Sequence, residues 1–286
     1  MLKHILPNQA PRLAALWVPL VTLLWLPIVA RRYFHGSTGR VYGVGLATKL
    51  RLLVAMVRNN VMVPSASFWI THLLMATEVL NVPPSVKGVI VECGCFKGGG
   101  TVNLSLVAAA CGRELHVFDS FAGLPDPEPG DSGHLLMIDG EVQTYAKGAY
   151  TGSLQEVMAN VERFGAPEVC TFHEGYFEDT LPGFDQPIVF ASVDVDLASS
   201  EKTCLEYLWP LLVDGGHLFT DEAPHLEIAT LFYDRQWWSE VLGTEAPGLV
   251  GAGNGLGLFP HKAGFFGSSI GYTAKIDRST LHSRPG

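Results

Sequence analysis

The sequence predicts an α/β fold: a doubly wound, mostly parallel sheet with helices on both faces. The first observation is a set of five short apolar runs, at 88–92, 115–119, 169–173, 188–194 and 217–221. The second is that four of these runs end on an acid, namely Glu92, Asp119, Asp194 and Asp221. The third is a glycine-rich turn, 94–100, directly after the first run. Uninterrupted apolar runs are typical of parallel strands buried on both faces, and such sheets bind ligands beyond the carboxyl ends of their strands.

Helical periodicity separates these runs, as a doubly wound sheet requires. The predicted helices span 46–63, 68–80, 99–111, 154–164 and 225–242, with another around Cys204 and Leu208. Ser153 and Glu156 form a capping-box pattern before the fourth helix, and Pro83 stops the second. In the glycine-rich part 247–277, short apolar alternations predict an antiparallel hairpin that completes the sheet.

The length of 286 residues suits one large domain with an appended segment. We assign residues 1–45 to an apolar segment and a basic linker, and residues 46–286 to the α/β domain with its N-terminal helices. The stretch 122–152 is rich in Pro, Gly and Asp, and its length predicts a lid over a site. The net charge of −9 implies no large basic surface, which argues against nucleic acid as a partner. The odd number of cysteines, five, indicates reduced thiols.

Residues 13–30 carry no charge and are mostly apolar. This length is at the short end for a membrane-spanning helix, and Pro19 and Pro27 weaken a regular helix. Because Arg31 and Arg32 follow the segment, the positive-inside bias predicts a cytoplasmic chain. Three interpretations stay open: a helix that tethers the chain to the inner face of the membrane, a helix buried between subunits, and a signal peptide.

The glycine-rich turn limits which cofactor the chain can hold. The pattern is Glu92-x-Gly94-x-x-x-Gly98, which is not the dinucleotide pattern Gly-x-Gly-x-x-Gly. It also lacks the Gly-Lys-Ser/Thr of a phosphate loop. A carboxylate at the strand tip would also oppose a pyrophosphate on the next helix N-terminus. S-adenosylmethionine suits the turn better, because Glu92 can offset its ammonium group while the turn amides receive its carboxylate.

Asp119 lies 27 residues after Glu92, at the end of the second run. A carboxylate there can accept hydrogen bonds from both hydroxyls of a ribose, a feature that proteins binding NAD share. Either acid can instead only cap the helix that follows it. An NAD-linked oxidoreductase therefore remains an alternative to an enzyme that uses S-adenosylmethionine.

A second group of acids follows the fourth and fifth runs, which are neighbours in a doubly wound sheet. Asp194 ends one run, and Asp221 with Glu222 ends the other. Carboxylate oxygens suit a hard cation such as Mg²⁺, which can lower the pKa of a substrate hydroxyl. We take these three residues as candidate metal ligands, and helix capping by one of them is the alternative.

Two further residues near these acids are candidates for catalysis. Asp196 would point away from Asp194 if both stood in extended backbone, and it remains a second candidate for metal or base. His225 lies just past Glu222 and could act as a base, although a lone histidine is more often structural. The candidate catalytic residues are thus Asp194, Asp196 and His225.

Four motifs in order resemble the TylF/MycF (macrocin O-methyltransferase) family. They lie at 91–99, 118–125, 175–182 and 194–197, within a match over about 70–240. The resemblance implies a Rossmann-like class I methyltransferase fold, S-adenosylmethionine, Mg²⁺, a small-molecule hydroxyl acceptor such as a sugar or natural product, and a homo-oligomer. By position it implies donor contacts from Glu92, Gly94, Gly98, Asp119, Ser120, Gly175, Tyr176 and Phe177. It also implies a metal on Asp194, Asp221 and Glu222, and a lid over 125–150.

This chain departs from the family pattern at two places near the metal. Asp221-Glu222 stands where the family usually has Asp-Asp, and Ala198-Ser199-Ser200 stands where a tyrosine and a glutamate are usual. The longer arm of a glutamate shifts the cation that it binds. A membrane-tethered, methyltransferase-like binding protein without catalysis is therefore a third interpretation.

Overall fold

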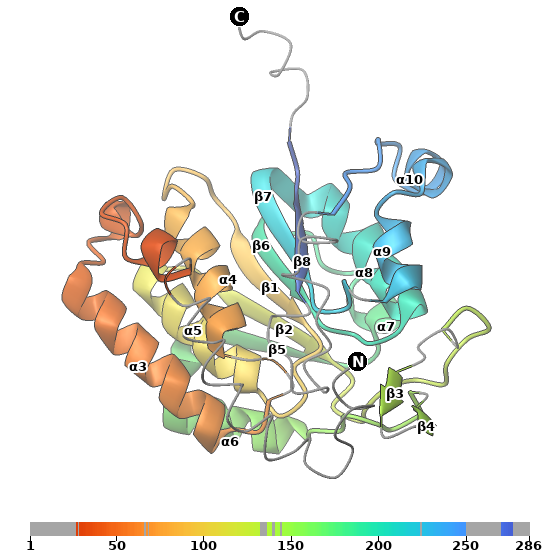
Figure 1. Cartoon of the computed structure of the whole chain (residues 1–286), viewed down its shortest axis with the longest axis horizontal. Helices are drawn as coiled ribbons and strands as arrows, with labels where there is room; N and C mark the ends of the chain where they lie inside the picture. Colours follow the sequence, from red (N-terminus) through yellow and green to blue (C-terminus); the bar gives the residue numbers. More distant parts are fainter. Residues whose placement is uncertain are drawn as a thin grey trace, which may run out of the picture.

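A six-stranded sheet forms the centre of the computed structural model (Figure 1). The structure describes residues 27, 29–65, 67, 69–131, 136–138, 141–143, 145–223, 225–249 and 270–276. The strands lie in the order β5 (Cys170–Glu174), β2 (Leu115–Asp119), β1 (Val89–Cys93), β6 (Ile188–Val193), β7 (Leu212–Thr220) and β8 (Gly271–Ala274). The first five are parallel, and β8 is antiparallel to β7. Because the chain runs outward from β1 to β5 and then returns to β6, the direction of winding reverses between β1 and β6. Ligands bind at such switch points.

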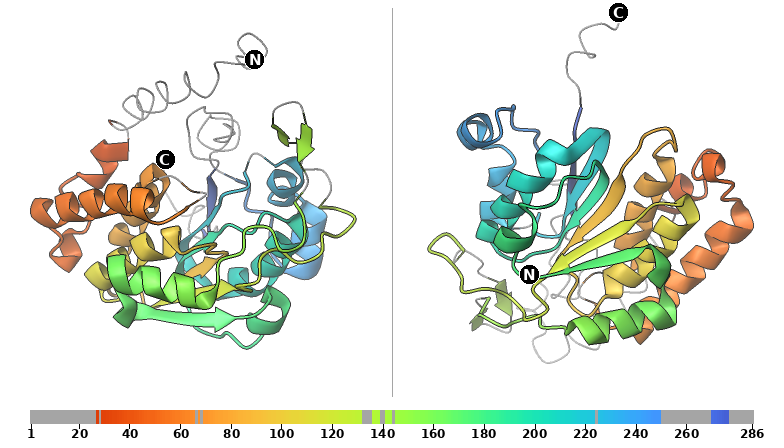
Figure 2. Two further views of the ribbon diagram at one scale, coloured as in Figure 1. Left: turned by 90° about the horizontal axis from the view of Figure 1, so that it is seen from below. Right: turned by 180° about the vertical axis from the view of Figure 1, so that it is seen from behind.

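Helices cover both faces of this sheet, as Figure 1 and the rear view in Figure 2 show. One face carries α3 (Leu46–Met62), α4 (Trp69–Asn81), α5 (Gly99–Cys111) and α6 (Leu154–Phe164). The other carries α7 (Phe177–Thr180), α8 (Ala198–Leu211), α9 (Leu226–Leu231) and α10 (Arg235–Val241). Short elements complete the described fold: η1 (Arg40–Tyr42), η2 (Pro167–Val169), and the antiparallel pair β3 (Leu136–Ile138) and β4 (Glu141–Gln143). The predicted fold class is confirmed.

The core lies in two layers, one on each side of the sheet. In β1, Ile90 packs in the layer of α4 and α5, whereas the next residue, Val91, packs in the layer of α8. Every residue of β1 is buried. Alternation of this kind, with both faces covered, explains why the sequence shows a continuous apolar run rather than a polar–apolar pattern.

Several boundaries differ from the sequence-based expectation. The predicted helix 225–242 is wrong as one helix, because Asp234 begins a new one: its side chain accepts from the backbone amides of Gln236 and Trp237. Strand β7 starts at Leu212, five residues earlier than predicted, and α7 was not predicted. The antiparallel strand 271–274 is confirmed against β7, whereas the expected second arm of the hairpin, around 256–259, lies outside the described residues.

The N-terminal region is described only from Pro27 onward, so most of the apolar segment 13–30 lies outside the described residues. Of the stretch expected to form a basic linker, Tyr33, Thr38 and Val44 are buried. Tyr33 and Val44 pack in the same core layer as α4 and α5, so this part of the stretch adheres to the α/β domain. Within the described residues, no helix combines the length and apolarity needed to cross a bilayer.

Candidate active site

Glu92 lies at the carboxyl end of β1 and is almost fully buried. Thr101, in the first turn of α5, donates a hydrogen bond of 2.6 Å to its Oε2 atom. The pKa of this carboxyl is raised to about 8. Burial is the largest cause, the hydrogen bond from Thr101 opposes the rise, and the charge of Asp119 adds to it. The side chain also fills the space that a Cβ atom on Gly100 would occupy, so a larger residue at position 100 would displace the carboxylate. Glu92 thus packs against the first turn of α5.

The glycine-rich turn brings the tips of β1 and β6 into direct contact. Gly94 has a φ of 79°, and a Cβ atom added there would collide with the carbonyl oxygen of Asp194. Gly98, with a φ of 84°, forms the N-terminal cap of α5. Both positions lie in the left-handed region that favours glycine. The predicted donor turn therefore directly adjoins the predicted metal ligand Asp194.

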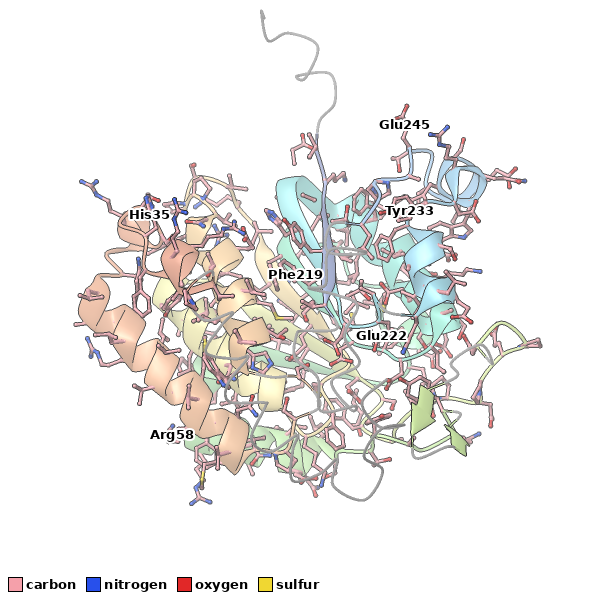
Figure 3. The ribbon with its side chains drawn as sticks, viewed as in Figure 1. His35, Arg58, Phe219, Glu222, Tyr233 and Glu245 are labelled. Carbon is pink, nitrogen blue, oxygen red and sulfur yellow. The ribbon has the colours of Figure 1, made fainter. Side chains whose placement is uncertain are left out.

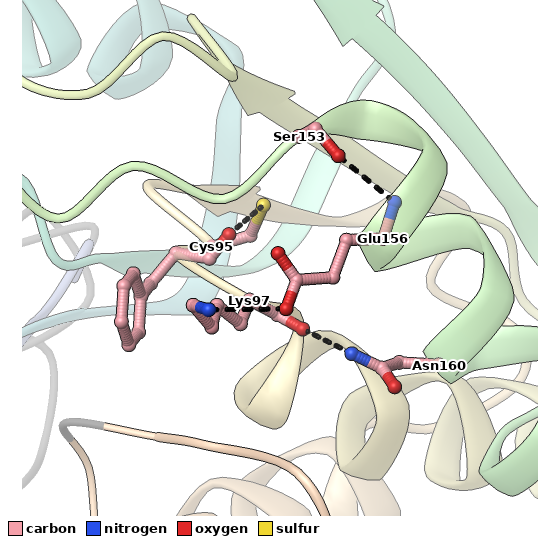
Figure 4. Close-up of polar contacts among 6 residues, drawn as sticks. Cys95, Lys97, Ser153, Glu156 and Asn160 are labelled. Atoms are coloured by element: carbon pink, nitrogen blue, oxygen red, sulfur yellow. Dashed lines mark hydrogen bonds and ion pairs between the residues drawn. The ribbon is translucent and has the colours of Figure 1, made fainter.

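Helix α6 holds this turn from outside, as Figure 4 shows. Lys97 forms an ion pair of 3.1 Å with Glu156, and Asn160 donates a hydrogen bond of 2.9 Å to the carbonyl oxygen of Lys97. The hydroxyl of Ser153 accepts from the amide of Glu156, which confirms the N-terminal half of the predicted capping box. Two polar contacts with α6 thus orient the turn before any ligand binds.

Asp119 contacts backbone amides on two sides of the turn. One carboxylate oxygen accepts from the amide of Cys95 and the other from the amide of Phe121, both at 2.7 Å. Ser120 turns to its own loop, because its hydroxyl donates to the carbonyl of Gly123 and accepts from the amide of Ala122. A carboxylate oxygen can accept a second hydrogen bond, so Asp119 keeps capacity for a ligand, whereas the hydroxyl of Ser120 is engaged on both sides.

Gly175, Tyr176 and Phe177 connect β5 to α7. The amide of Gly175 donates to the carbonyl of Asp119 at 3.1 Å, so this loop lies against the end of β2. Tyr176 caps α7, and Phe177 packs against the core layer of α8. The side chains of Tyr176 and Phe177 are half-buried. The loop that holds these three residues therefore lies beside Asp119, and their contact with a donor stays a prediction.

Asp194, Asp221 and Glu222 come together beyond β6 and β7. One carboxylate oxygen from each lies within 4.8 Å of the others. The predicted triad of candidate ligands is therefore brought into one cluster, with Glu222 labelled in Figure 3 at the end of β7. The Oε2 atom of Glu222 is buried and has no hydrogen-bond partner. Ser67 donates a hydrogen bond of 3.2 Å to Asp194.

Crowding in this cluster shifts the pKa of its members. Burial, followed by the charges of Asp221 and Asp196, raises the pKa of Asp194. Burial, followed by the charges of Asp194 and Asp221, raises the pKa of Glu222. Several carboxylates that share one desolvated site repel one another, and a cation relieves that repulsion. The arrangement is therefore chemically suited to an oxygen-binding cation.

Asp196 is turned by its backbone, which has a φ of 62°. Asp194 and Asp196 therefore do not stand in one extended segment, and Asp196 is not part of the three-acid cluster among the described residues. Its carboxylate is instead hydrogen-bonded by the hydroxyl of Tyr145, a contact that raises the pKa of Tyr145 after the larger effect of burial. The sequence analysis missed Tyr145, because an isolated tyrosine in a polar stretch carries no periodic signal.

Three aromatic rings extend from Tyr145 over the site. Its ring centroid lies 6.0 Å from that of Tyr150 and 6.0 Å from that of His225, and Tyr150 lies 5.9 Å from Phe96. His225 caps α9 three residues after Glu222 of the three-acid cluster. The end of the predicted lid thus touches both the glycine turn and the loop after β7.

Both flanks of the stretch 122–152 are anchored. The backbones of Leu124 and Ala149 pair, since the amide of Leu124 donates to the carbonyl of Ala149 at 3.0 Å. Asp131 is buried and accepts from the amide and the hydroxyl of Ser199, at the start of α8. Ser199 therefore holds the lid in this chain.

Glu201, in α8, is another residue that the sequence analysis missed. It is fully buried, Thr220 donates a 3.3 Å hydrogen bond to its Oε2 atom, and its Oε1 atom has no partner. Burial raises its pKa to about 8. A sequence signal did exist: Glu201 stands three, four and seven residues before Cys204, Leu205 and Leu208, on the apolar face of the helix.

With this geometry in place, the comparisons with known proteins decide the family. The model of the macrocin-O-methyltransferase (TylF) family matches residues 69–235, which is more than half of the chain. The chain belongs to this family. Membership makes it an S-adenosylmethionine-dependent O-methyltransferase. No curated protein matches the sequence significantly.

Two solved methyltransferase structures resemble this chain. The O-methyltransferase NovP is 20% identical, with a TM-score of 0.59 over 79% of this chain and 98% of NovP. The calicheamicin methyltransferase CalS11 is 18% identical, with a TM-score of 0.47 over 81% of this chain and 80% of CalS11. At this identity the likeness to NovP is evidence for the shared Rossmann-like architecture alone.

Proposed function

We propose that this enzyme methylates a hydroxyl group of a small molecule, such as a sugar or another natural product, with the assistance of Mg²⁺. The observation that carries the proposal is the contact between the glycine turn and the acidic cluster. Because Gly94 packs on the carbonyl of Asp194, a methyl donor held on the turn and an acceptor held at the cluster would be neighbours. Methyl transfer is an in-line displacement, so it depends mainly on such placement.

The donor half would bind S-adenosylmethionine through the tips of β1 and β2. Glu92 would lie near its ammonium group, and Asp119 would lie near its ribose. Amides of the turn 94–100 other than that of Cys95, which donates to Asp119, would lie near its carboxylate. Tyr176 and Phe177 would lie beside the adenine. The raised pKa of Glu92 supports this assignment, since a buried carboxyl is stabilised as a carboxylate when a cationic group binds next to it.

The acidic half fits a magnesium ion. Asp194, Asp221 and Glu222 would hold it, and the buried oxygen of Glu222 that lacks a partner supports this fit. A bound Mg²⁺ lowers the pKa of a hydroxyl group and orients its oxygen. The carboxylate of Asp196, held by Tyr145, and the imidazole of His225 flank the cluster and are the candidate acceptors of the hydroxyl proton.

The stretch 122–152 would cover the acceptor as a lid. The ring contacts of Tyr145 with His225 and of Tyr150 with Phe96 support this role. We also propose a homo-oligomer in the cytoplasm, with the apolar segment 13–30 either between subunits or at a membrane. Sedimentation of the full chain tests the first alternative.

Substitution of Asp194 by alanine tests the proposed function most simply. Turnover should fall by about 100-fold or more, the effect of removing a group that stabilises developing charge. Binding of S-adenosylhomocysteine, measured by calorimetry, should change little. Asp214→Ala, an exposed acid in β7, is the matched control. Full turnover by the Asp194→Ala protein would refute the metal assignment, and binding of NADH in place of S-adenosylhomocysteine would refute the donor assignment.

A further inference from the structure

Helix α3 exposes a continuous apolar face. The residues on it recur at intervals of three and four and are each 40% or more exposed: Leu46, Leu50, Val54, Val57 and Val61. At 3.6 residues per turn they fall within an arc of about 80°. Val54 is 66% exposed and Val61 82%, so most of each of these two side chains faces solvent.

The opposite face of α3 packs on the rest of the domain. Leu52, Met56 and Asn59 are buried, and α3 packs on α4 and α5. Asn59 donates hydrogen bonds to the side chain of Asn103 and to the carbonyl of Phe164. The helix is thus already anchored by one face, and the exposed apolar face is surplus to folding. Contiguous exposed apolar surface of this kind marks an interaction site.

The charges around this face have one sign. Residues 1–77 contain eight Lys and Arg and no Asp or Glu, although the whole chain has a net charge of −9. Arg51 and Arg58 are exposed and lie along one rim of the apolar face, at about 40–60° from its edge by the helical period. A surface that pairs apolar side chains with cations fits a bilayer that contains anionic lipids.

The start of α3 is joined to the chain that leads back to the apolar segment 13–30. The hydroxyl of Tyr33 donates to the carbonyl of Lys49 at 3.0 Å, and the amino group of Lys49 donates to the carbonyl of His35 at 2.7 Å. The apolar N-terminal segment therefore enters the described structure beside the first turn of α3.

We propose that the exposed face of α3 docks on an anionic lipid bilayer. A second copy of the chain packed antiparallel on this face would bring Arg51 and Arg58 of both protomers to the same side, where like charges repel. Figure 1 shows α3 outermost in its layer, with α4 and α5 between it and the sheet. In Figure 3 Arg58 and Glu222 lie well apart, so docking leaves the acidic cluster uncovered. The inference is independent of the proposed function.

An environment-sensitive dye on a cysteine in place of Val54 tests the contact directly in the full chain. Four of the native cysteines are buried, and the labelled wild-type chain provides the background for Cys170. With phosphatidylglycerol-containing vesicles, the emission should shift to the blue, and it should return when 0.5 M NaCl screens the charges. Val241→Cys, which places the dye at an exposed apolar position on α10, is the control and should show no shift.

Three results would overturn the proposal. One is unshifted emission from position 54 in protein that floats with the vesicles, since anchoring would then come from elsewhere. Another is an equal shift on pure phosphatidylcholine, which would remove the role of the cations. The third is a shift that depends on protein concentration without vesicles, which would assign the face to a second copy. The variant V54D/V61D should weaken binding to anionic vesicles at least tenfold, whereas the equally charged M158D/V241D should not.

Discussion

The two halves of the site differ in how completely their polar groups are paired. In the donor half, Asp119 accepts hydrogen bonds from two backbone amides, and Glu92 accepts one from the hydroxyl of Thr101. Helix α6 holds the glycine-rich turn by a further hydrogen bond. In the acidic half, Glu222 has a buried oxygen without a partner, and three carboxylates crowd within 4.8 Å. The donor half is therefore organised by the chain itself. The acidic half stores electrostatic repulsion that only a cation or bound protons can relieve.

The largest loss of stability is expected from a substitution at Gly94, where the donor half contacts the acidic half. Gly94→Ala should destabilise the protein by about 3 kcal/mol or more, because the new methyl group collides with the carbonyl of Asp194 in a left-handed backbone. Gly112→Ala is the matched control, since Gly112 has a φ of 60° but open space around it, and it should cost only about 1 kcal/mol. Equal losses in chemical denaturation would show that the tips of β1 and β6 are not in contact.

Glu201 adds a buried carboxyl near the acidic half, since its charge is among those that raise the pKa of Glu222. Its effect on the free energy of unfolding should depend on pH. Its pKa in the folded chain, about 8, exceeds the ordinary value of about 4.5. Between these values the folded chain binds more protons than the unfolded one, so the contribution of Glu201 to stability falls as the pH rises. Glu201→Gln should therefore be close to the wild type in stability near pH 5 and should exceed it by about 3 kcal/mol more at pH 8 than at pH 5.

The control for that measurement is Glu206→Gln, an exposed position on the same helix, which should leave the pH profile unchanged. Parallel profiles for the wild type and Glu201→Gln would show that Glu201 is not desolvated in the fold.

A smaller effect is expected at the lid. Tyr145→Phe removes the hydroxyl that donates to Asp196 but keeps the ring beside His225 and Tyr150. A hydrogen bond to a charged group is worth about 1.5–3 kcal/mol, so kcat/KM for the acceptor should fall roughly tenfold while donor affinity is kept. Tyr207→Phe, at a half-exposed position on α8, is the control. A loss of donor affinity would mean that Tyr145 serves the donor half instead.

The fold and the acidic edge could be predicted from the sequence, because both follow from local patterns. Apolar runs that end on Glu92, Asp119, Asp194 and Asp221 give parallel strands whose tips share one edge, and chain order then makes β6 and β7 neighbours. The break between α9 and α10 was missed, although Asp234 is a typical capping residue, because the apolar periodicity continues through it.

The contacts of the site with the lid could not be predicted in the same way. Tyr145 and Asp131 reach their partners Asp196 and Ser199 across 51 and 68 residues of sequence, and no periodicity encodes such distances. The positive φ of Asp196 could not be predicted from its neighbours in the sequence either. Turn geometry and long-range hydrogen bonds therefore set the part of the site that a single sequence leaves open.

The central claim is that the acidic half needs a cation whereas the donor half does not. Thermal unfolding at pH 8, with and without Mg²⁺ in the millimolar range, tests it in the wild type and in Glu222→Gln. The account predicts a saturable rise in Tm of the wild type with Mg²⁺, a much smaller rise in Glu222→Gln, and equal stabilisation of both by S-adenosylhomocysteine. A wild-type Tm that does not respond to Mg²⁺, or an identical rise in both proteins, would contradict it.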